Sequence, residues 1–191
     1  MQRLDEKKRR DITTAAVRLF AARPFHEVKL DDVAAAARVG KGTLYLYFKN
    51  KEDLYISLIQ DGFVRLVDSL REQLADGRLP PWEALERVIS ELSRFAVSHP
   101  DLYELMRSVP LTKLRTDKRR ELTSLIESII RRGIKGAVMS DRQPELTATF
   151  IPAMVRAAML FGPKPVSADA LAQHITQLLG QGLARKEPRC R

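Results

Sequence analysis

Apolar side chains recur at intervals of three and four residues along nearly the whole chain, which is the spacing of helices with one buried face. No stretch alternates between apolar and polar positions in the way that a half-buried strand does. The pattern therefore predicts an all-α protein. The predicted helices occupy residues 5–22, 30–37, 41–48, 51–74, 82–98, 101–109, 117–139, 144–161 and 167–183.

The predicted helix at 144–161 is apolar on more than one face, which is unusual for a helix at the surface of a globular protein. One face can pack against its own chain, whereas the other requires a second cover. The amphipathic helix at 167–183 can share that role. Because a two-fold interface mates a surface with itself, these helices from two copies predict a four-helix dimer interface.

A different pattern occupies residues 30–48. An alanine-rich helix ends near Arg38, and a second short helix follows Gly40 and carries aromatic side chains beside lysines. Two short helices joined by a tight turn are typical of a helix-turn-helix, whose second helix enters the DNA major groove. Leu44 and Phe48 lie four residues apart and are expected to face the core.

Residues 39–54 read VGKGTLYLYFKNKEDL, which resembles the DNA-binding signature of the tetracycline-repressor (TetR) family. The resemblance covers about the first third of the chain. It implies an N-terminal three-helix, helix-turn-helix DNA-binding domain at residues 1–50. It also implies a helical-bundle domain at residues 51–191 that binds a small-molecule effector and forms a homodimer. The chain departs from the family pattern at Arg38, where glycine is usual, and at Gly40, where serine is usual.

The predicted DNA contacts lie on and around the second short helix. Side chains outside its buried face are available for phosphates and thymine methyl groups, and Gly42 allows close approach of the backbone. The resemblance implies that Lys51 holds a phosphate and fixes the docking angle. The alternative for the tyrosines is a core position with a locally bonded hydroxyl. The full predicted set is Lys29, Lys41, Gly42, Thr43, Tyr45, Leu46, Tyr47, Lys49 and Lys51.

The net positive charge is concentrated near the N-terminus. The formal net charge is +9, and residues 1–50 hold 11 Lys and Arg against 6 Asp and Glu. More than half of the excess therefore lies in the first quarter of the chain, which favours a polyanionic partner over a role in solubility alone. The basic run at 7–10 is either a solvated helix end or a further phosphate contact.

The sequence gives little support to an enzyme. His26, His99 and His174 are widely separated and form no metal or nucleophile spacing, and no phosphate-binding loop or dinucleotide fingerprint is present. We expect no catalytic residue, no metal and no cofactor. The single cysteine, Cys190, allows no intramolecular disulfide. With no secretory signal and no run of about 18 apolar residues, a cytoplasmic protein without membrane contact is expected.

The remaining aromatic and methionine positions are candidates for lining an effector pocket, although such residues at helical spacing are usually core. The candidates are Trp82, Phe95, Tyr103, Met106, Phe150 and Met154. The sequence thus predicts a ligand-responsive transcriptional repressor that binds operator DNA as a homodimer and is released by an apolar or amphipathic small molecule. The alternative is an architectural DNA-binding protein or an activator without an effector.

Overall fold

The computed structural model describes residues 5–100 and 116–183, and their ordered elements are helical, which confirms the all-α prediction. The predicted helix at 101–109, with Tyr103 and Met106, lies outside the described residues, as does Cys190. The elements are α1 (Glu6–Ala22), the 3-10 turn η1 (Phe25–Glu27), α2 (Leu30–Ala36), α3 (Lys41–Tyr47), α4 (Lys51–Leu74), α5 (Pro81–Val97), α7 (Thr116–Lys135), α8 (Pro144–Phe161) and α9 (Ala168–Leu183).

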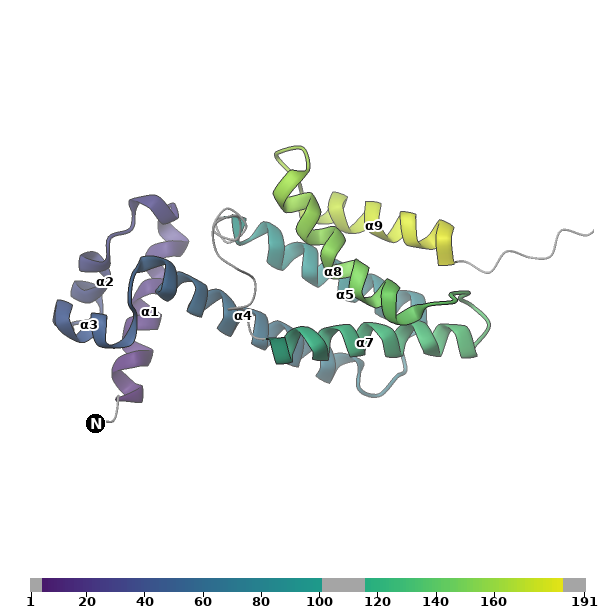
Figure 1. Ribbon diagram of the computed structural model, residues 1–191, viewed down its shortest axis with the longest axis horizontal. Helices are drawn as coiled ribbons and strands as arrows, with labels where there is room; N and C mark the ends of the chain where they lie inside the picture. The colour runs from purple at the N-terminus through teal and green to yellow at the C-terminus, as the bar shows by residue number, and fades with distance from the viewer. Residues whose placement is uncertain (1–4, 101–115, 184–191) are drawn as a thin grey trace, which may run out of the picture.

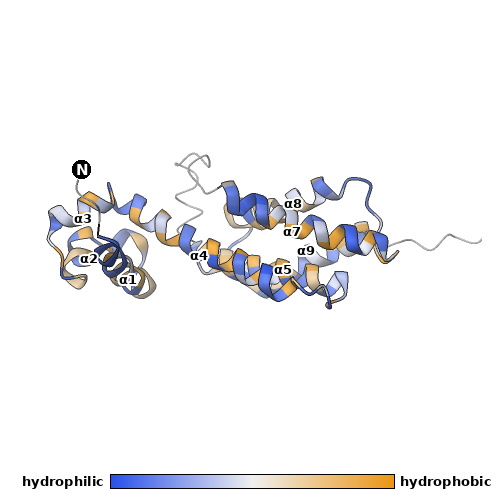
Figure 2. Ribbon diagram, turned by 90° about the horizontal axis from the view of Figure 1, so that it is seen from below, coloured by the Kyte–Doolittle hydropathy of each residue, from blue (hydrophilic) through white to orange (hydrophobic). Residues whose placement is uncertain are grey.

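The helices form two groups that α4 joins (Figure 1). The head consists of α1, α2 and α3. The body consists of α5, α7, α8 and α9, and the C-terminal part of α4 runs along it beside α7. Figure 2 shows apolar and polar segments alternating along these helices, as expected for elements with one face in a core. In the described part of the chain, no helix is long and apolar enough to cross a membrane.

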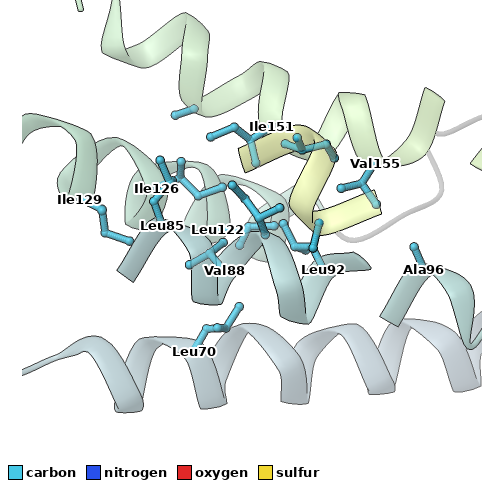
Figure 3. Packing of buried hydrophobic residues seen from close by; sticks show 14 of the residues in the cluster. Leu70, Leu85, Val88, Leu92, Ala96, Leu122, Ile126, Ile129, Ile151 and Val155 are labelled. Carbon is cyan, nitrogen blue, oxygen red and sulfur yellow. The ribbon is translucent and has the colours of Figure 1, made fainter. Parts of the chain in front are cut away.

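The body has a continuous apolar core. Leu85, Ile126 and Ile151 are fully buried and come from α5, α7 and α8, and Figure 3 shows their side chains meeting between these helices. Leu70 brings the apolar side of α4 into this core, from below in the view of Figure 3. The connecting helix is therefore packed into the body over its second half.

A second cluster holds the head together. Its fully buried members include Ile12 of α1 and Val33 of α2, and Leu54 from the first turn of α4 belongs to it. Helix α4 therefore contributes buried residues to both clusters. The division of the chain at residue 50 remains a prediction.

A short polar contact ties α4 to α7. The ammonium of Lys118, 14% exposed, donates to Asp68 of α4 (2.7 Å) and to Glu121 of its own helix (2.6 Å). The hydrogen bond from Lys118 lowers the pKa of Asp68. This contact therefore supports folding above the ordinary carboxyl pKa, and its contribution is lost as the pH falls through the lowered value.

Helix α7 ends at Lys135, four residues earlier than the predicted end at residue 139. Ala137 has a φ of 55°, and the Val138 N–H donates back to the Gly133 carbonyl (3.0 Å), which stops the helix. Met139 then folds against Gly133, where a Cβ atom would meet its sulfur. The apolar spacing continues past the helix because Met139 is buried outside it.

The turn between α2 and α3 is left-handed at Arg38, with a φ of 56°. Its N–H donates to the Ala35 carbonyl (3.1 Å), and the Val39 N–H donates to the Ala34 carbonyl (3.0 Å). These two bonds form a Schellman motif, in which the left-handed position usually holds glycine. Arg38 therefore carries the strain expected of a side chain in this backbone conformation.

We expect Arg38→Gly to stabilise the protein by about 1 kcal/mol, because glycine has no Cβ to strain in a left-handed position. This corresponds to a rise of about 2–4 °C in the melting temperature for a chain of this length. Arg18→Gly, at an exposed position inside α1, is the control and is expected to lower it. A lower melting temperature for Arg38→Gly would contradict this explanation of the turn.

Candidate nucleic-acid interface

Helix α3 has a buried side and an open side. Leu44 is 1% exposed, and Phe48, which follows the helix, is 3% exposed, so both anchor α3 in the head as predicted. Tyr45 and Leu46 point outward and are 47% and 64% exposed. The Tyr45 phenol and the Leu46 isobutyl group are therefore exposed on the open side of α3 and take no part in the core of the head.

Tyr47 lies differently from the prediction. Its side chain packs partly against the head cluster rather than standing open. Its hydroxyl accepts a hydrogen bond from the Asp5 N–H (2.9 Å) and donates one to the Asp5 carbonyl (3.0 Å). Asp5 is also the N-cap of α1, where its carboxylate accepts from the Lys7 N–H. Tyr47 thus ties the start of α1 to α3. The prediction differed because helical spacing alone does not reveal a partner 42 residues away.

Tyr47→Phe is expected to lower the melting temperature, because two hydrogen bonds to the α1 N-cap are lost, at about 1 kcal/mol for the net contribution of one such bond. Amide hydrogen exchange should increase selectively in the first turn of α1. Tyr45→Phe, whose hydroxyl is exposed, serves as the control with an unchanged melting temperature. Equal melting temperatures for both variants would show that the contact to Asp5 does not stabilise the fold.

Lys51 is also engaged inside the head. Its Nζ donates to the Phe25 carbonyl (2.8 Å) and lies 4.4 Å from the centre of the Phe25 ring. Asn50 caps α4 by accepting from the Asp53 N–H (2.7 Å), and the Asp53 carboxylate accepts from the Lys49 N–H (3.0 Å). The start of α4 is therefore fixed against η1, and a phosphate contact by Lys51 remains a prediction.

The other predicted cations surround α3. Lys41 forms an ion pair with Asp31 of α2 (2.9 Å), and this hydrogen bond raises the Lys41 pKa. Lys29 and Lys49 are exposed at the two ends of the motif. Thr43 is half-buried on α3. These positions give the outer side of α2 and α3 a basic border, which suits contact with phosphates.

Arg9 makes contacts within the head that the sequence did not predict. The Arg9 guanidinium donates to the Ser57 hydroxyl of α4 (3.1 Å) and lies 5.9 Å from the centre of the Phe48 ring. Arg9 therefore joins α1 to α4 and covers the end of α3. The basic run at residues 7–10 predicted a cation at position 9, but not its place over the Phe48 ring.

Gly42 is exposed, and a Cβ atom at this position would meet nothing within 4 Å. The fold itself therefore does not need glycine in α3. We expect Gly42→Ala to stabilise the protein by roughly 0.5–1 kcal/mol through helix propensity. The same change is expected to weaken DNA binding, because the methyl group prevents close approach of the backbone. Unfolding and DNA titration measured together test this, and unchanged DNA affinity would remove Gly42 from the interface.

Four of the predicted effector residues lie in the described part of the chain. Trp82, Phe95 and Met154 pack against the body core, but they are spread along α5 and α8. Trp82 and Phe95 stand 13 positions apart on α5, about 20 Å along a helix axis. The Trp82 indole donates to the Val138 carbonyl (3.4 Å). Phe150 is 56% exposed on the outer side of α8, while Met154 packs partly against the core.

Phe95 has aromatic neighbours that sequence reasoning did not identify. Its ring lies 5.8 Å from that of Phe63 in α4 and 4.5 Å from that of His99. Gly62 lies beside this contact, and a Cβ there would be at an ordinary contact distance of 3.4 Å from the Phe95 ring. The aromatic contact between α4 and α5 therefore lies where the connecting helix leaves the head.

The model of the DNA-binding domain described as "Bacterial regulatory proteins, tetR family" matches residues 12–58, which span the head cluster and the start of α4. Over 167 residues the chain is 28% identical to an uncharacterised HTH-type transcriptional regulator, YhgD, of Bacillus subtilis, covering 83% of this chain and 84% of that protein.

Two solved structures share the fold. One is a TetR/AcrR-family regulator from Thermobifida fusca, with a TM-score of 0.73 and 22% identity over 95% of this chain and all of the other. The second is the regulator FadR of Bacillus subtilis in complex with stearoyl-CoA, with a TM-score of 0.66 and 22% identity over 90% and 97% of the two chains. Residues 12–58 therefore carry the DNA-binding domain of the TetR family of bacterial regulatory proteins, and the chain as a whole has the fold of solved TetR-family regulators.

Proposed function

We propose that the protein is a ligand-responsive transcriptional repressor that binds operator DNA as a homodimer and is released by an apolar or amphipathic small molecule. The observation that carries this proposal is the open side of α3. Tyr45 and Leu46 expose apolar surface there, and exposed lysines lie at both ends of the motif. This arrangement suits insertion into a major groove between two phosphate backbones.

The outer side of α8 supports the dimer. Leu146, Phe150 and Phe161 are 43%, 56% and 82% exposed and fall on one side of the helix. Ala153 and Ala157 lie between them on the same side and allow a second helix to approach closely. Leu178, 48% exposed on α9, extends the apolar surface. We call the α8 residues, with Leu178, the apolar face, and we propose that a second copy of the chain covers it.

The connection between head and body supports control by an effector. Helix α4 places Leu54 in the head cluster and Leu70 in the body core. A molecule that separates α4 from α5 or α7 would tilt α4 and move the head. In a dimer, the two heads must match grooves about 34–36 Å apart, so a small tilt misaligns one of them. A preference of about 1–3 kcal/mol for the tilted state is a typical coupling energy.

The effector class follows from the character of the body and from one similar structure. Phe95, Met154 and Trp82 present apolar surface at the edge of the body core and remain our candidates for effector contact. Phe150 is assigned instead to the dimer, because it faces away from that core. FadR of Bacillus subtilis, which shares the fold, was crystallised with stearoyl-CoA. We propose an amphipathic molecule of comparable character here.

The reciprocity of binding provides the test of this control. Operator DNA and effector must weaken one another by the same factor. We would measure stearoyl-CoA binding by calorimetry with the free protein and with the protein on DNA obtained by selection from random sequences. A lower affinity on DNA, matched by a lower DNA affinity with ligand, supports release. Equal affinities in both titrations would contradict release by this ligand class.

A further inference from the structure

An open hollow lies on the outside of the body, in the groove between α7 and α8. Its volume is about 510 Å³, which is within the usual range for small-molecule sites. Helices α7 and α8 pack against each other, and α8 runs obliquely to α7 (Figure 1). The hollow is lined by Arg119, Arg120, Thr123, Ser124 and Thr149.

The two arginines of this hollow have no acidic partner among residues 5–100 and 116–183. Both are exposed on the first turns of α7. The neighbouring cations differ, since Lys118 is held by Asp68 and Glu121, and Arg131 is held by Glu127. Within the described part of the chain, neither guanidinium is therefore held by a carboxylate.

The nearby carboxylates are already occupied. Glu121 accepts from Lys118 (2.6 Å), while Glu127 and Glu145 lie 2.6 and 3.4 Å from the Arg131 guanidinium. The hydrogen bond to Glu127 raises the Arg131 pKa, as expected for an ion pair. These acids consequently do little to cancel the positive field of Arg119 and Arg120.

The remaining lining groups are hydroxyls. Those of Thr123 and Thr149 donate to the carbonyls of Arg119 (2.9 Å) and Glu145 (3.0 Å), and both can rotate toward a stronger acceptor. Within the described part of the chain, the Ser124 hydroxyl makes no hydrogen bond. The wall of the hollow thus offers two guanidinium forks and three hydroxyl donors, and no lining residue carries a negative charge.

We propose that this hollow binds the phosphate or pyrophosphate group of a small molecule. Guanidinium forks match the spacing of phosphate oxygens, and hydroxyls supply the additional donors that a tetrahedral polyanion accepts. The site is on the body and concave, whereas the DNA-reading helix α3 is on the head (Figure 1). A small molecule therefore fits the hollow better than a duplex backbone does. Thr149 precedes Phe150 of the apolar face, so the bound group lies at the flank of the proposed dimer.

The test is calorimetric titration of the full chain with pyrophosphate at low ionic strength, without DNA. The double variant Arg119→Gln, Arg120→Gln is expected to lose about tenfold in affinity for each charge-assisted contact removed. Arg119→Lys with Arg120→Lys keeps the charge but not the fork, and an intermediate loss is expected. Arg142→Gln removes an exposed arginine that does not line the hollow, and its affinity should equal that of the unaltered protein.

Comparison of ligands identifies the source of the phosphate. Tighter binding of ADP than of pyrophosphate would assign the site to an esterified small molecule, and equal binding would assign it to the free anion. Absence of pyrophosphate binding, or binding that the double glutamine variant retains, would overturn the proposal. An equal loss in Arg142→Gln would also overturn it, because net charge alone would then explain the binding. Since no DNA is present, the outcome is independent of the proposed regulatory function.

Discussion

Replacing Phe150 by glutamate is expected to convert the protein to a monomer at micromolar concentration and to lower operator affinity at least about a hundredfold. In a two-fold interface the change occurs twice, and it buries two unpaired carboxylates in an apolar contact. A monomer carries one head, so it loses the gain in DNA affinity, a factor of about 10²–10⁴, that joining two binding modules provides. Sedimentation velocity measures the first effect, and DNA titration measures the second.

Val17→Glu is the matched control for the oligomeric state. Val17 is a comparably exposed apolar residue, 51% against 56% for Phe150, but it lies on α1 in the head. This variant should remain a dimer. A Phe150→Glu protein that sediments as a dimer would show that the apolar face of α8 is not the interface.

Replacing Tyr45 by alanine is expected to weaken operator binding by about 1–3 kcal/mol per half-site, the scale of one good base contact. Two half-sites double this loss of binding free energy, which corresponds to at least about a thirtyfold decrease in affinity. The melting temperature should hardly change, because nearly half of the side chain is already exposed. Affinity measured at several salt concentrations would separate this loss from a general change in phosphate contact.

Leu44→Ala provides the contrast one position away. Leu44 is 1% exposed, and its truncation is expected to destabilise the head by about 2–5 kcal/mol. The two variants thus separate reading of DNA from folding of the head. If Tyr45→Ala melted early and bound DNA normally, Tyr45 would belong to the core of the head.

The sequence predicts the elements well where the determining contacts are local. The helix-turn-helix was recognisable because two short helical segments flank a tight turn, and because Leu44 and Phe48 are four residues apart. Arg38 was identifiable as a departure from the usual glycine, and its left-handed backbone explains why glycine is usual there. The apolar face of α8 was predictable because no single core can cover a helix on all sides.

The predictions that failed depend on distant parts of the chain. Tyr47 was placed outward, since helical spacing does not show that the Asp5 backbone lies beside its hydroxyl. The end of α7 was extended to Met139, because a buried methionine after the turn continues the apolar spacing.

Footprinting on DNA selected from random double-stranded sequences is the sharpest test of operator recognition by α3. The protein would be allowed to enrich its own sites, and the protected positions would then be mapped. A two-fold symmetric sequence is expected, with two protected major-groove half-sites whose centres lie one helical turn, about 34–36 Å, apart. Protection without sequence preference, depending only on salt, would contradict operator recognition by α3 and would indicate general phosphate binding instead.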